Sequence, residues 1–188
     1  MKSKLVLGAQ GSVVLLCALG LKQYYSTASP DQLRWILAPT TWLVELLSGQ
    51  TFTFESHAGY MSSDHSFLIA ASCAGVNFLI TAFLMLTLKS LWNNRSSKLG
   101  WSFIPIAGII SYLATICANT VRIWIALESR SLSEEIDWLS ASQTHRLEGI
   151  VVYFGFLLIL FLFAENTKQR SVLDQLRQLR FPLLVYYV

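Results

Sequence analysis

Three residues near the ends of apolar runs combine nucleophilic, cationic and basic chemistry: Cys73, Arg122 and His145. Cysteine is the most nucleophilic common side chain, but in an apolar setting its thiolate needs a nearby cation or base. His145 is suited to accept the thiol proton and to return it to a leaving amine. Arg122 stays charged and offers a fork of donors to a thiolate or an oxyanion. Because an arginine near hydrocarbon is costly, we expect Arg122 to be functional.

Asn119 precedes Arg122 by one helical turn, so it is predicted to orient the guanidinium or to add a second donor on the same face. Each of these residues also has an ordinary structural interpretation. A lone buried cysteine is more often structural than catalytic, and an arginine near a span end often extends to lipid headgroups. A histidine at the start of a span is commonly interfacial. The chemistry alone leaves an enzyme and a non-enzymatic protein both open.

Composition indicates one integral membrane domain over residues 1–188. The chain is 54% hydrophobic and 13% charged, and its apolar residues come in long blocks. A net charge of +3 is too small to suggest nucleic acid as a partner. Cys17, Cys73 and Cys117 are widely spaced, without a C-x-x-C pair, which argues against a disulfide framework or a zinc site. We expect no metal and no organic cofactor.

The hydropathy pattern predicts an all-α membrane protein with about four transmembrane helices. The apolar runs cover residues 5–21, 66–92, 101–127 and 147–164. Residues 31–48 contain charges and Pro39, which favours an amphipathic helix that is interfacial or re-entrant. The segment 49–65 is polar and predicted to be aqueous. The first run also resembles a signal peptide with a cleavage site near Ala28, but its length favours an uncleaved span.

The distribution of basic residues predicts the orientation. Four spans with both termini in the cytoplasm place Lys2, Lys4, the loop 93–98 and the basic tail 165–188 inside. The segments 49–65 and 128–145 then lie outside. Cys73 is expected about seven residues inside its span, roughly 10 Å from the end. Arg122 and His145 approach from the same side, so the three residues are predicted to meet near the outer edge of the hydrocarbon, from three helices.

The order of short motifs resembles the exosortase/archaeosortase family. The resemblance is carried by Ser72-Cys73-Ala74-Gly75 before an apolar span, by Asn119-Thr120-Val121-Arg122-Ile123, and by His145 followed by Gly149. It covers about residues 30–165. The chain looks like a compact member, of the exosortase K type. The family's usual CSG-like triplet is altered here, since Ala74 replaces the commoner serine.

The resemblance implies a cysteine peptidase or transpeptidase of the bacterial cytoplasmic membrane, with its active site toward the outer face. Its partners would be exported proteins with a C-terminal sorting signal, which is a short motif such as Pro-Glu-Pro, a transmembrane helix and a basic tail. The implied roles are Cys73 as nucleophile, Arg122 as stabiliser and His145 as acid and base. The acceptor molecule stays open. Two alternatives remain, namely a membrane thiol oxidoreductase pairing Cys73 with Cys117, and a non-enzymatic assembly subunit.

Overall fold

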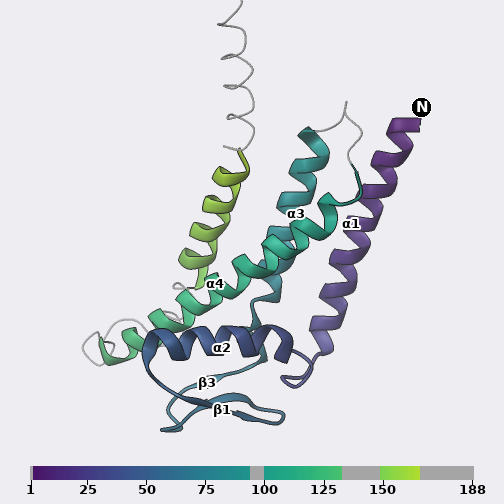
Figure 1. Ribbon diagram of the computed structural model, residues 1–188. Helices are drawn as coiled ribbons and strands as arrows, with labels where there is room; N and C mark the ends of the chain where they lie inside the picture. Colours follow the sequence, from purple (N-terminus) through teal and green to yellow (C-terminus); the bar gives the residue numbers. More distant parts are fainter. Residues whose placement is uncertain (1, 94–99, 133–148, 166–188) are drawn as a thin grey trace, which may run out of the picture.

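The computed structural model describes residues 2–93, 100–132 and 149–165, which form a mostly helical protein (Figure 1). Its elements, in chain order, are α1 (Lys2–Thr27), α2 (Arg34–Ser48), β1 (Phe52–Glu55), β2 (Gly59–Ser62), β3 (Leu68–Ile69), the 3₁₀ turn η1 (Ala71–Ala74), α3 (Val76–Asn93), α4 (Phe103–Leu132) and the helix Gly149–Glu165.

Among the described residues, three helical segments are long and apolar enough to cross a membrane: Leu5–Thr27, Ala71–Trp92 and Phe103–Ser129. They correspond to the first three predicted spans. The helix Gly149–Glu165 is apolar but shorter, so a fourth span stays a prediction. Large apolar side chains are exposed along these helices, including Leu16, Ile109 and Phe154. Such an exterior suits lipid rather than water, and it indicates a membrane protein.

Small and polar side chains occupy the space between the long helices. Ala82 of α3 and Ala118 of α4 are fully buried, as are Thr87, Ser111 and Thr115. The Thr87 and Thr115 hydroxyls donate to carbonyls of their own helices, which satisfies them without a partner from water. Small residues let helices approach closely where lipid gives no hydrophobic driving force. At the far end of α3, Lys89 pairs with Glu165 at 2.8 Å and so ties α3 to the helix Gly149–Glu165.

Helix α2 lies across one end of the bundle, at a steep angle to α1 and α3 (Figure 1). Its buried residues are Ile36, Leu37, Thr40, Thr41 and Val44, which share one face, so the amphipathic helix predicted for residues 31–48 is confirmed. The sequence suggested a segment interrupted by Pro39, but the helix continues through it. Tyr112 of α4 stacks on Trp35 and donates to its carbonyl oxygen at 2.7 Å, which fixes α2 against α4.

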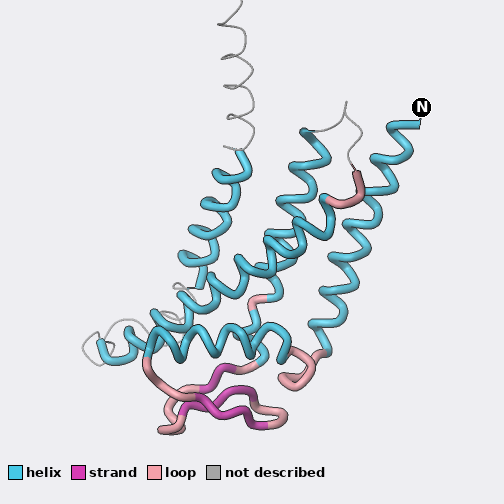
Figure 2. Tube along the Cα trace, in the orientation of Figure 1, coloured by secondary structure: helices cyan, strands magenta, loops and turns pink. Residues whose placement is uncertain are grey.

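A three-stranded antiparallel sheet corrects the all-α prediction. Its order is β1-β2-β3, and the strands lie together at the end of the molecule beyond α2 (Figure 2). Phe52 pairs with Ser62 in β1–β2, and Tyr60 with Ile69 in β2–β3. The polar segment 49–65 lacks a helical pattern but contains alternating aromatic and polar residues, which is the pattern of a half-exposed hairpin. The prediction that this segment is aqueous used its polarity alone and not this alternation.

The sheet also moves the start of the second span. The predicted span began at residue 66, whereas Leu68–Ile69 are strand β3 and α3 begins at Val76. Cys73 therefore lies in η1, before the long helix, and not about two turns inside it. The reason is local: a short apolar run fits a strand as well as a helix, and β2 offers Leu68 and Ile69 a partner. Gly75, with φ of 65°, then separates η1 from α3.

Candidate functional site

Asn119 and Arg122 of α4 meet at one hydroxyl. Arg122 Nη1 donates to Tyr153 Oη at 3.1 Å, and Tyr153 Oη donates to Asn119 Oδ1. The guanidinium also lies over the Tyr153 ring, with 5.5 Å between its carbon and the ring centroid. Asn119 is fully buried, and the spacing of three residues places it and Arg122 on the same face, as the sequence predicted. Tyr153 comes from the helix Gly149–Glu165, so this network joins two helices.

Two glycines make room for the two α4 side chains. A Cβ atom at Gly75 would lie 2.8 Å from Asn119 Cγ, and one at Gly149 would lie 3.1 Å from Arg122 Nε. Gly75 also has a positive φ, which L side chains rarely adopt. The positions of Asn119 and Arg122 therefore depend on glycine at both places. Both glycines belong to the motifs that carry the family resemblance.

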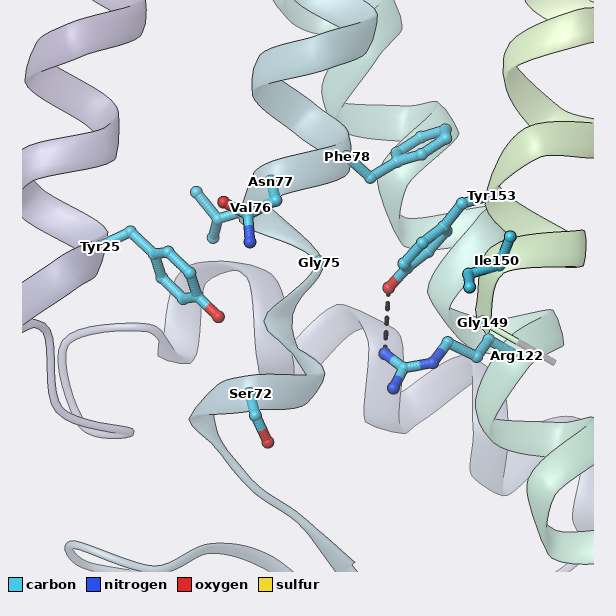
Figure 3. A pocket seen from close by; sticks show the side chains of 10 residues that line it. All are labelled: Tyr25, Ser72, Gly75, Val76, Asn77, Phe78, Arg122, Gly149, Ile150 and Tyr153. Carbon is cyan, nitrogen blue, oxygen red and sulfur yellow. Dashed lines mark hydrogen bonds between the residues drawn. The ribbon is translucent and has the colours of Figure 1, made fainter. Parts of the chain in front are cut away.

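A pocket of about 360 Å³ opens beside this network (Figure 3). Tyr25 of α1 and Tyr153 face it from opposite sides, with Gly75 between them, and the Arg122 guanidinium reaches toward the turn that carries Ser72 (Figure 3). Arg122 is the single charged side chain among the residues that line it. The lining residues are Tyr25, Ser72, Gly75, Val76, Asn77, Phe78, Arg122, Gly149, Ile150 and Tyr153. The pocket thus combines apolar walls with a cation and several hydroxyl or amide groups.

Cys73 lies behind the pocket wall rather than on its surface. Its side chain is 7% exposed and belongs to a buried cluster that includes Leu37 of α2 and Ile123 of α4. Its neighbours Ser72 and Gly75 do line the pocket. The thiol is therefore next to residues that line the pocket, and it is itself largely covered by the core.

The Asn119 amide keeps one unused donor. Its Oδ1 accepts from Tyr153, while Nδ2 is buried without a hydrogen-bond partner among the described residues. Nδ2 lies against Gly75, which lines the pocket, while Asn119 itself lies behind that glycine. A buried donor without a partner is costly, so it is a reasonable place for a ligand's oxygen to bind. Chemically, Asn119 and Arg122 together can hold an oxygen that gains negative charge.

The structure brings together three of the four residues singled out from the sequence: Cys73, Asn119 and Arg122. His145 lies outside the described residues. Cys17 and Cys117 are exposed on α1 and α4. Within the described residues, no group of three or more His, Cys, Asp or Glu side chains could hold a metal ion.

Sequence reasoning missed the two tyrosines of the site. Tyr153 follows Gly149 by four residues, which places both on one face of a helix. Since Gly149 was already part of a motif, this spacing was a usable signal. Tyr25 gave none, because an aromatic residue at the end of a span is ordinary at a membrane interface.

Comparison of the chain with protein-family models, with curated proteins and with solved structures finds no match.

Proposed function

We propose that this protein is a membrane-embedded cysteine peptidase or transpeptidase that removes C-terminal sorting signals from exported proteins, as exosortases are thought to do. The observation that carries the proposal is the hydrogen-bonded set of Arg122, Tyr153 and Asn119 beside the turn that bears Cys73. Acyl transfer to a thiol needs fixed donors where the carbonyl oxygen becomes negative. Arg122 and Asn119 would supply such donors beside the pocket.

The proposed first half-reaction forms a thioester. Cys73 Sγ adds to the scissile carbonyl carbon as the thiol proton passes to His145, and the oxygen gains negative charge next to Arg122 and Asn119. Collapse of this intermediate breaks the C–N bond. The departing amine takes the proton from His145, and the acyl group stays on sulfur. In the described structure the thiol is largely covered, so attack requires η1 to present Sγ to the pocket.

The second half-reaction releases the acyl group. An amine on a cell-surface acceptor, or water, adds to the thioester carbon and gives a proton to His145. The carbon–sulfur bond then breaks, and the Cys73 thiolate regains the proton. An amine gives a transpeptidase and water a peptidase.

The proposed setting is the bacterial cytoplasmic membrane with α2 and the sheet at the outer face. The N-terminus and the end of α3 lie at the opposite end of the bundle from the sheet (Figure 1). Lys2 and Lys4 belong to that same end, which is the arrangement expected when it faces the cytoplasm. A substrate's transmembrane helix would lie in the bilayer beside the pocket, with the helix Gly149–Glu165 as the fourth span and α2 at the interface.

The burial of the cysteines argues against the oxidoreductase alternative. A dithiol mechanism needs two sulfurs that meet, and Cys117 is the partner that the sequence analysis considered. Its side chain is exposed on α4, whereas Cys73 is buried in the core cluster. The assembly-subunit alternative requires that Cys73 be dispensable, which the following experiment decides.

The decisive experiment is mass spectrometry of C-terminally anchored membrane proteins in cells that express the wild type or Cys73→Ala. Cys17→Ala and Cys117→Ala are matched controls, because they remove exposed thiols remote from the pocket. We expect full-length substrate, with its C-terminal helix still attached, to accumulate in the Cys73→Ala cells alone. Identical termini in all four strains would refute the proposal and leave the assembly-subunit interpretation.

Arg122→Lys tests the donor role of the guanidinium. Lysine keeps the charge but loses the planar fork, so we expect loss of processing nearly as complete as in Arg122→Ala. Full processing by the lysine variant would show that a point charge suffices.

A further inference from the structure

We infer that Tyr153 is a positioning residue of the proposed acyl-transfer site, whose hydroxyl holds Arg122 and Asn119 in the arrangement that receives the substrate's carbonyl oxygen. The inference rests on the proposed function and adds to it a residue from a different helix.

The Tyr153 hydroxyl uses both of its hydrogen-bonding capacities on the two α4 side chains. It accepts from Arg122 Nη1 at 3.1 Å and donates its proton to Asn119 Oδ1. Both Nδ2 and Oδ1 of the Asn119 amide lie against Gly75, which lines the pocket. A single hydroxyl therefore bonds to both the guanidinium and the amide and holds the two groups relative to each other.

The ring of Tyr153 fixes the hydroxyl in turn. It stacks on Phe78 of α3, with ring centroids 5.1 Å apart and planes at 29°. Phe78 is almost fully buried, and both rings line the pocket. Figure 3 shows the Tyr153 side chain extending from its helix past Phe78 to Arg122. The hydroxyl is thus held from three helices, which is the support that an accurate site requires.

Ring and hydroxyl have separate tasks, so they can be tested separately. Tyr153→Phe keeps the stacking on Phe78 and removes both hydrogen bonds to α4. Tyr112→Phe is a matched control on the same bundle. Its ring stacks on Trp35 at 5.7 Å, and its hydroxyl donates to a backbone carbonyl away from the pocket. A general structural effect of losing a tyrosine hydroxyl that bonds to another helix should appear in both variants.

The first readout is the reactivity of Cys73 toward two thiol reagents of opposite charge. The parent protein carries Cys17→Ala and Cys117→Ala, so that Cys73 is the remaining thiol. It is treated with sulfonatoethyl and with trimethylammonioethyl methanethiosulfonate, each rate being normalised to that of a small free thiol. A guanidinium held near the thiol favours the anionic reagent. The rate ratio therefore measures how Arg122 is held, and a loss of stability alone does not move it selectively.

We expect the ratio in Tyr153→Phe to fall most of the way to that of Arg122→Gln, while Tyr112→Phe keeps the parent ratio. With a substrate identified by mass spectrometry, kcat of Tyr153→Phe should fall by about 10- to 100-fold with little change in KM. If Tyr153→Phe matches Tyr112→Phe in both the ratio and kcat, the inference is wrong. Failure of the proposed function is distinguishable, because processing would then survive Cys73→Ala.

Discussion

Two regions differ in the polar contacts that hold them to the helices. One is the site wall, formed by Gly75, Asn119, Arg122 and Tyr153, and the other is the small sheet. At the site wall, Asn119 is fully buried and accepts from Tyr153, which in turn accepts from Arg122. At the sheet, the polar contacts with α2 and with the turn before it are part-buried or exposed. Glu45 Oε1 accepts from the Phe52 N–H at 2.8 Å, and Asp31 Oδ2 lies 3.6 Å from Nδ1 of His57, whose side chain is 90% exposed.

The contrast shows which polar contacts of this fold are costly to lose. Exposed ion pairs contribute roughly 0–1 kcal/mol because water screens them. A buried polar group that loses its partner costs about 1–3 kcal/mol. The polar contacts of the sheet are therefore individually weak, and its apolar residues Phe52 and Tyr60 pack on the buried cluster that includes Ile69 of β3 and Leu37 and Val44 of α2. At the site wall, the arrangement of Asn119 and Arg122 depends on their shared hydrogen bonds to Tyr153.

The largest expected effect follows from Gly75→Ala. The new Cβ would collide with Asn119 at a backbone position with positive φ, so both the turn and the amide must move. We expect a loss of about 2–4 kcal/mol of unfolding free energy, together with loss of substrate processing. Denaturation in mixed micelles, followed by tryptophan fluorescence, measures the first quantity.

Gly108→Ala is the control for that variant, since nothing lies within 4 Å of a Cβ at Gly108 in the second turn of α4. It should be neutral or stabilising by up to about 1 kcal/mol. Equal effects of the two substitutions would contradict the role given to the Gly75–Asn119 contact.

Gly149→Ala should have an intermediate effect. Its Cβ would lie 3.1 Å from Arg122 Nε and 3.6 Å from Cδ, so the side chain must shift by a few tenths of an ångström. We expect processing to fall about tenfold, because a small displacement of a donor is costly in a site of this kind. Unfolding free energy should change by less than about 1 kcal/mol. Normal processing by this variant would show that Arg122 has more freedom than the contact suggests.

The two glycines also show what the sequence could predict. The apolar blocks predicted the three long helices, because a run of about twenty apolar residues is the length that a membrane-spanning helix needs. The motif residues Gly75, Asn119 and Arg122 gave three members of the site wall. The sequence could not show why these two positions are glycine. The side chains that they make room for, Asn119 and Arg122, lie on another helix, so no local sequence pattern indicates the contact.

The errors have a physical cause as well. Leu68 and Ile69 extend an apolar run, so hydropathy alone assigns them to the helix that follows. Only the pairing with β2, a contact across the chain, makes them a strand. The charges of residues 31–48 have partners that the sequence did not indicate. Asp31 accepts from the His57 N–H in the turn between β1 and β2, and Glu45 accepts from the Phe52 N–H of β1.

On the sheet side, Glu45→Ala should cost little. The Phe52 N–H at the start of β1 loses its acceptor, which is worth about 0.5–1.5 kcal/mol of unfolding free energy. Processing should stay at the wild-type level, because the sheet's other ties to α2 remain. Glu45→Gln, which keeps a side-chain oxygen as acceptor, should lie close to the wild type in the same micelle titration. If the glutamine variant is as unstable as the alanine variant, the charge and not the acceptor holds the strand.

The smallest effect concerns Asp64, in the turn between β2 and β3. Hydrogen bonds from the Ser62 hydroxyl at 2.6 Å and from the Ser66 N–H at 3.1 Å lower the pKa of its carboxyl to about 2. A folded-state pKa below the ordinary value of about 3.9 means that the ionised group stabilises the turn above about pH 4. That contribution is lost as the pH falls through about 2.

Hydrogen exchange at the Ser66 amide, compared between the wild type and Asp64→Asn, isolates the effect from the intrinsic pH dependence of exchange. Above pH 4 the wild-type amide should be protected a few-fold more than that of the variant, and the two should converge near pH 2. The effect is small because Asp64 is fully exposed, so water competes for the carboxylate. A constant difference down to pH 2 would mean that the turn is held by the Ser62 Oγ contact with the Phe67 N–H rather than by the ionised carboxylate.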